Sequence, residues 1–66
     1  MEHIYVLVPA QAEWEDLIIF LSKEEAVEKS KSWTKTPVQI FTRAEKGGYR
    51  PTYSYYLNGV YVEYKE

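Results

Sequence analysis

The chain lacks cysteine altogether and has a single histidine, His3. Without cysteine it can form neither disulfides nor thiolate metal sites, and one imidazole is too few for a zinc cluster. Small domains commonly need such cross-links, because a chain of 66 residues buries only about 60% of its unfolded surface. We therefore expect one domain over residues 1–66, without metal or cofactor, that is stabilised by an apolar core.

Long apolar runs are also missing, since the longest, residues 4–8 and 17–21, have five residues each. A membrane-spanning helix needs about 20 apolar residues, and no secretory leader is visible before the first run. The absence of cysteine is compatible with a reducing compartment. These features predict a soluble, intracellular protein that does not bind membranes.

An excess of positive charge is absent, because eight Lys and Arg residues face ten Asp and Glu residues, giving a net charge of −2. General nucleic-acid-binding proteins are usually basic. The charge balance therefore favours other kinds of partner.

No group of residues shows the spacing that is typical of an active site. His3 lies near a chain end and has no evident nucleophile partner. The acidic residues between positions 13 and 16 lack the regular ligand spacing of a calcium loop. Gly47 and Gly48 are not followed by the lysine–serine pair and helix of a phosphate-binding loop. We expect that the protein is not an enzyme.

Aromatic residues are abundant, with seven Tyr, two Trp and two Phe. Runs of β-branched and aromatic residues predict strands over residues 4–8, 17–21, 38–43, 52–57 and 60–64. The motif from Ser22 to Glu25 fits a capping box and predicts a helix from there to about residue 33. The predicted fold class is α+β in the order β-β-α-β-β-β, with one mostly antiparallel sheet and a single helix packed on one face.

The pair Asn58-Gly59 is typical of a two-residue type I′ turn between the last two strands. This turn pairs Leu57 with Val60, and it sets which side chains share a face. We expect the more apolar face to meet the core, and that face carries Tyr53, Tyr55, Leu57, Val60, Val62 and Tyr64. The runs 4–8 and 17–21 do not alternate between polar and apolar residues, which predicts that both are central or covered strands.

One short helix cannot cover both faces of a five-stranded sheet. We expect the uncovered face to expose some of Tyr5, Leu7, Ile18, Phe20, Phe41, Tyr56 and Tyr61. An apolar patch of more than a few hundred Å² usually marks a contact surface, and the commonest arrangement is a twofold homodimer. The alternatives are a sheet that curls and closes on itself, or a different protein partner.

The leading functional prediction is a protein-interaction or structural module, because tyrosine, tryptophan and arginine dominate binding hot spots. Trp14 and Tyr49 either protrude as anchors or fold back over the core. The candidate interaction surface comprises Tyr5, Trp14, Ile18, Phe20, Phe41, Tyr49, Arg50, Tyr56 and Tyr61. The alternative is single-stranded nucleic-acid binding by base stacking, which would use Tyr49, Tyr56 and Tyr61 with Arg43, Lys46 and Arg50.

Three segments of the chain carry a resemblance to a known group of proteins. They are Ser22-Lys23-Glu24-Glu25-Ala26, Val38-Gln39-Ile40-Phe41 and the run from Gly48 to Gly59, of which Gly48-Tyr49-Arg50-Pro51-Thr52-Tyr53 is the most distinctive part. Together they are similar to small uncharacterised proteins of large double-stranded DNA viruses of protists. The resemblance covers most of the chain and implies no catalytic residue. It implies a viral accessory or virion-associated protein, located in the host cytoplasm or the virion.

Overall fold

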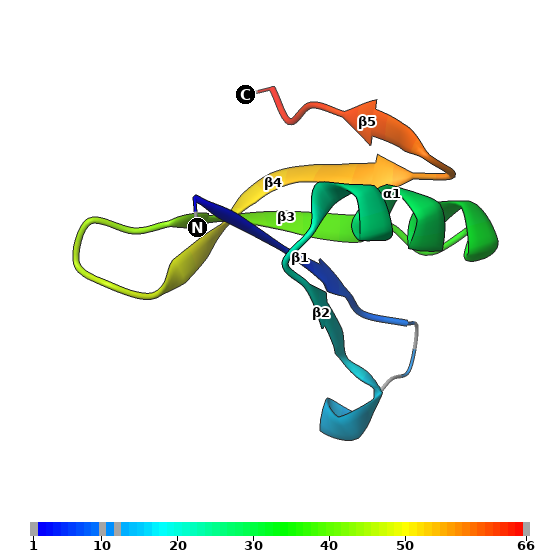
Figure 1. The fold of residues 1–66 in the computed structure, drawn as a ribbon, viewed down its shortest axis with the longest axis horizontal. Coiled ribbons are helices and arrows are strands. Elements are labelled where there is room, and N and C mark those ends of the chain that lie inside the picture. The colour runs from blue at the N-terminus through cyan, green and yellow to red at the C-terminus, as the bar shows by residue number, and fades with distance from the viewer. Residues whose placement is uncertain (1, 10, 12, 66) are drawn as a thin grey trace.

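The computed structural model describes residues 2–9, 11 and 13–65. One antiparallel sheet of five strands, in the order β2-β1-β3-β4-β5, is accompanied by one α-helix and one short 3-10 helix (Figure 1). The elements are β1 (His3–Leu7), η1 (Trp14–Asp16), β2 (Ile18–Phe20), α1 (Lys23–Ser32), β3 (Val38–Arg43), β4 (Tyr49–Leu57) and β5 (Val60–Val62). The predicted α+β class, element order and antiparallel pairing of the first two strands are confirmed.

The helix α1 begins where the sequence predicts. The Ser22 hydroxyl accepts a hydrogen bond from the Glu25 amide at 3.4 Å and so satisfies one of the free N–H groups of the first turn. The helix ends at its C-cap, Trp33. Only Ala26 and Ser30 are buried among its residues, so α1 presents a narrow face of small side chains to the sheet.

Ser30 attaches the helix to the turn of the last hairpin. Its hydroxyl donates to the Val27 carbonyl at 2.7 Å and accepts from the Gly59 amide at 2.8 Å. Ser30 is completely buried. The hydroxyl therefore satisfies a backbone group of the turn in a place that water does not reach.

The hairpin of β4 and β5 has the predicted turn and register. Asn58 and Gly59 have φ of 51° and 78°, as a type I′ turn requires. Leu57 pairs with Val60, and the next two pairs follow in register. The turn pair therefore determines the pairing of the two strands, as expected.

An irregularity in β4 lies opposite Ile40 of β3. At its centre Tyr53 has a positive φ of 69°, which is unusual for a residue with a side chain. The Thr52 hydroxyl donates to the Ile40 carbonyl at 2.8 Å and accepts from the Ser54 amide at 3.1 Å. These bonds hold a β-bulge that the sequence reading did not predict.

The core lies between α1 and one face of the sheet. It consists of Leu7, Ala26, Val38, Ile40 and Tyr56, of which the first three are completely buried. Adjacent strands pair Leu7 with Val38 and Val38 with Tyr56, so these side chains form one row beneath the helix.

The prediction of which hairpin face meets the core was wrong. Tyr56 is only 8% exposed and Ser54 is buried beside it, whereas Val60, on the expected core face, is 61% exposed. The Ser54 hydroxyl is satisfied because it accepts from the Tyr64 amide at 3.0 Å. The hairpin therefore turns its Ser54–Tyr56 side toward the helix.

The ends of the sheet also differ from expectation. The apolar run at 17–21 forms the edge strand β2, not a central strand, and Ile19 and Leu21 are each 58% exposed. The sheet does not close on itself, because β2 and β5 are its two separate edges among the described residues. Figure 1 shows β1 and β2 running at a steep angle to β3 and β4, as in a strongly twisted sheet.

Candidate interaction surfaces

The face of the sheet away from α1 carries a row of side chains that crosses all five strands. The pairing register aligns Ile19, Val6, Gln39, Tyr55 and Val62, one residue from each strand. Successive residues of a strand point to opposite faces, so this row backs the core row of Leu7, Val38 and Tyr56. Gln39, on the central strand β3, contributes the one carboxamide.

Two further pairs extend this row on the same face. Ile4 pairs with Phe41 on one side, and Leu57 pairs with Val60 on the other. We call the whole surface the open face, and it comprises Ile4, Val6, Ile19, Gln39, Phe41, Tyr55, Leu57, Val60 and Val62. Ile19 and Val60 are more than half exposed, and the other members are partly exposed. The open face is therefore a broad, nearly continuous apolar surface.

No described helix or loop packs over the open face, because α1 lies on the other side of the sheet. The accessible surface of the molecule is 5165 Å², whereas about 4,400 Å² is usual for a folded monomer of its mass. This excess of about 800 Å² belongs to the molecule as a whole, including the open face, the β1–β2 arm and the β3–β4 hairpin tip.

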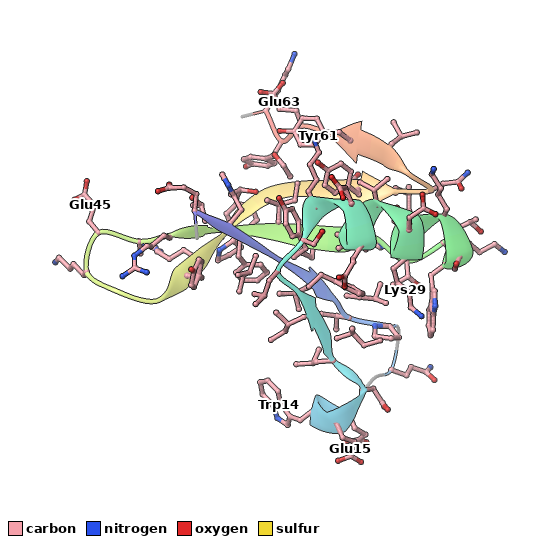
Figure 2. All side chains as sticks on the ribbon, viewed as in Figure 1. Trp14, Glu15, Lys29, Glu45, Tyr61 and Glu63 are labelled. Atoms are coloured by element: carbon pink, nitrogen blue, oxygen red, sulfur yellow. The ribbon has the colours of Figure 1, made fainter. Side chains whose placement is uncertain are left out.

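The β1–β2 loop presents an exposed tryptophan. Trp14 is 86% exposed and lies at the end of the β1–β2 arm (Figure 2). Val8, Glu13, Trp14 and Leu17 border a shallow cavity of about 260 Å³ there. The Asp16 carboxylate accepts from the Glu13 amide at 3.0 Å and closes the turn that holds the indole outward. Of the two alternatives for Trp14, the structure shows the protruding one.

The residues expected on the uncovered face are distributed over both faces. Tyr5, Ile18 and Phe20 pack against the core on the helix side, and Leu7 and Tyr56 belong to the core itself. Tyr61 pairs with Tyr56 and shares its face. Phe41, by contrast, lies on the open face, opposite Ile4. The expectation that these residues form one uncovered surface was therefore wrong, because most of them lie on the helix side of the sheet.

A pocket lies on the helix side of the sheet. It has a volume of about 260 Å³, and its lining includes Tyr5, Tyr56, Tyr61, His3, Lys23 and Thr52. The ring centroids of Tyr5 and Tyr56 are 6.2 Å apart, and those of Tyr56 and Tyr61 are 5.7 Å apart. We call this site the tyrosine pocket.

The two inner tyrosines of this pocket stay protonated at neutral pH. Burial raises the pKa of the Tyr56 phenol above its ordinary value of 10.0, and the neighbouring Tyr61 acts in the same direction. Burial also raises the pKa of Tyr5; Tyr56 adds to this effect, and Lys23 partly opposes it. Both hydroxyls can therefore act as hydrogen-bond donors near pH 7.

The basic residues expected near the stacking tyrosines gather at the tip of the β3–β4 hairpin. Arg43, Lys46 and Arg50 border a cavity of about 500 Å³ together with Glu45, which Figure 2 shows at the far end of the hairpin. Tyr49 pairs with Arg43 in the same hairpin. The residues predicted to bind a nucleic-acid strand are thus divided between the hairpin tip and the tyrosine pocket.

The sequence reading missed most of the open face, including Val6, Ile19, Tyr55 and Val62. Both valines of the β4–β5 hairpin lie on the open face, whereas the helix side carries Tyr56 and Tyr61 with Ser54, so apolarity alone selected the wrong side. Residue size could have indicated the side that meets the helix, because the small helix residues Ala26 and Ser30 leave room for a large ring such as Tyr56.

Comparison with known proteins finds no matching family model, no similar curated protein and no similar solved structure. No helix in the described part of the chain is long and apolar enough to cross a membrane. The two candidate sites therefore have to be assessed on their own chemistry.

Proposed function

We propose that the protein is a structural or interaction module that forms a twofold homodimer through the open face of its sheet. The observation that carries this proposal is the row of Ile19, Val6, Gln39, Tyr55 and Val62 across all five strands, with no described element covering it. An uncovered apolar surface of this extent is characteristic of a contact surface.

The accessible surface of the molecule is consistent with a second copy as the occupant. The whole chain exposes about 800 Å² more than is usual for its mass, and the open face contributes to this excess. Each partner in a stable interface of standard size buries about 800 Å². Two sheets packed face to face, about 10 Å apart, bury such surfaces in the manner of a β-sandwich. Burial of apolar surface at the interface would also stabilise a domain whose core, among the described residues, has five buried apolar side chains.

The position of Gln39 supports a symmetric arrangement. It lies on the central strand and in the middle of the apolar row. A twofold axis through this point would bring the two Gln39 side chains together. A carboxamide both donates and accepts hydrogen bonds, so it can pair with a copy of itself.

Pairing through the sheet edges would be a weaker solution. The edge strands β2 and β5 have only three residues each. Short edges offer few backbone groups to a further strand. The open face therefore provides the larger surface for self-association.

A charge substitution on either side of β5 tests the proposal. Val60, on the open face, and Tyr61, on the opposite face, are 61% and 53% exposed, so a glutamate at either site is tolerated by the monomer. We expect Val60→Glu to dissociate the dimer in sedimentation velocity experiments and Tyr61→Glu to leave it intact. Circular dichroism of both variants is the control for folding, and we expect native-like spectra. Equal dissociation by both variants, or by neither, would contradict an interface on the open face.

A further inference from the structure

The tyrosine pocket lies on the opposite side of the sheet from the open face, so it remains accessible in the dimer proposed above. Its three rings come from β1, β4 and β5 and form a row with centroid separations of 6.2 and 5.7 Å. Tyr56 is almost buried at the base of this row, whereas Tyr61 is 53% exposed at the edge. The neighbouring rings are tilted by 47° and 56° to one another, so a flat ligand ring can stack on one of them, the exposed Tyr61, as nucleic-acid bases stack on aromatic side chains.

The polar groups of the pocket favour a negatively charged ligand. Lys23 and His3 line it, and none of the described side chains in its lining is a carboxylate. Arg50 is separated from His3 by Thr42 of the strand between them, and it borders the cavity at the hairpin tip. Lys23 is therefore the main positive charge of the described lining.

The hydroxyl groups of the pocket add hydrogen-bond capacity. A phenol with the ordinary pKa of 10.0 is already protonated at neutral pH, and burial raises the pKa of Tyr5 and Tyr56 further, so both are hydrogen-bond donors there. The Thr52 hydroxyl is already committed, since it bonds the Ile40 carbonyl and the Ser54 amide. Free donors therefore come mainly from the tyrosines and Lys23, and they suit an oxygen-rich anionic group.

We propose that the tyrosine pocket binds a small ligand that combines one planar heteroaromatic ring with one anionic group, the chemistry of a nucleoside monophosphate. The ring stacks on the exposed Tyr61, beside Tyr56, and the anionic group lies against Lys23 and His3. The volume of about 260 Å³ lies just below the usual range of ligand pockets and suits one base-sized ring. This chemistry occurs in free nucleotides and in each residue of a single strand.

Titration of the full chain with adenosine 5′-monophosphate, followed by two-dimensional amide NMR near pH 7, tests the proposal. We expect saturable shifts of the Tyr5, Lys23, Tyr56 and Tyr61 amides, and binding about tenfold tighter than that of adenosine or inorganic phosphate alone. The absence of saturable shifts at these residues up to about 10 mM nucleotide would overturn the proposal. So would shifts confined to the hairpin tip at residues 43–50.

An oligonucleotide titration separates the two sources of this chemistry. We expect a short oligo-deoxyadenylate to bind no more than about tenfold tighter than the mononucleotide, because the pocket has room for one base. Much tighter binding of the strand, with shifts that extend to Arg43 and Lys46, would overturn the assignment to a small ligand. It would favour a strand-binding surface instead.

Matched variants locate the binding site. Tyr61→Ala and Tyr64→Ala each remove a half-exposed ring, but Tyr64 packs against Tyr53 in a tilted arrangement and lies outside the lining described for the pocket. Lys23→Gln and Lys35→Gln each remove one exposed charge, and only Lys23 lines the pocket. We expect Tyr61→Ala and Lys23→Gln to weaken binding about fivefold or more, and the two controls to leave it unchanged. Equal losses in a variant and its control would overturn the proposal.

Discussion

At the scale of single residues, the buried Ser30 hydroxyl has the clearest energetic role. It accepts from the Gly59 amide at 2.8 Å and donates to the Val27 carbonyl, so it joins α1 to the hairpin turn. Ser30→Ala leaves the Gly59 amide without this partner. An unsatisfied buried group costs about 1–3 kcal/mol.

We therefore expect Ser30→Ala to lower the free energy of unfolding by about that amount, measured by urea denaturation with tryptophan fluorescence. The control is Ser32→Ala on the exposed last turn of the same helix, for which little change is expected. Alanine favours the helix more than serine does, so propensity alone would stabilise both variants. Similar stability losses in both variants would therefore contradict a specific role for the bond to Gly59.

The buried phenol of Tyr56 makes stability depend on alkaline pH. Burial raises its pKa in the folded protein above the ordinary value of 10.0, so the folded state resists loss of the proton. The contribution of the neutral phenol to stability is complete below about pH 10 and is lost as the pH rises through the folded value. Urea denaturation between pH 8 and pH 11 should show stability falling only in the upper part of this range.

Tyr56→Phe is the control for this pH dependence, since phenylalanine keeps the ring and has no ionisable proton. We expect the decline above about pH 10 to be smaller in this variant than in the natural chain. An identical decline would assign the pH effect to other groups.

At the scale of elements, the bulge in β4 depends on one hydroxyl. Thr52 Oγ1 bonds both the Ile40 carbonyl and the Ser54 amide, while Tyr53 between them has a positive φ. Thr52→Val keeps the shape of the side chain and removes both bonds, and we expect it to cost about 1–3 kcal/mol. The comparison is Thr42→Val, whose exposed bond to the Glu2 carbonyl is longer, at 3.3 Å. Thermal denaturation of the two variants would contradict this role for Thr52 if Thr42→Val were the more destabilised.

The sequence was most informative where a local motif determines the backbone. Ser22 places the start of α1 and Asn58-Gly59 determines the hairpin register, because each acts through bonds or dihedral angles within a few residues. The edge position of β2 and the bulge at Tyr53 depend on pairing with distant strands. Hydrophobic patterns could not predict either of them.

The prediction of which side of the hairpin meets the helix was wrong for a similar reason. The face with Tyr55, Leu57, Val60 and Val62 is the more apolar in sequence, yet the helix covers the face with Ser54 and Tyr56. Ser54 is tolerated there because its hydroxyl accepts from the Tyr64 amide. A tertiary hydrogen bond of this kind leaves no trace in the local sequence.

At the scale of the whole molecule, the two faces of the sheet have different environments. One holds a small core under α1 and the tyrosine pocket beside it. The other is the open face. The count of one helix and five strands predicted that one face would be uncovered, but it did not predict which residues that face carries. The viral resemblance and an intracellular location stay predictions.

The most direct test of the homodimer is the molar mass in solution, measured by light scattering over a dilution series. We expect twice the chain mass of 7.8 kDa at high concentration. Val60→Glu should reduce it to the mass of one chain, because it places a charge on the open face. A natural chain that keeps the mass of a single copy at every concentration would contradict self-association and leave the open face to a different partner.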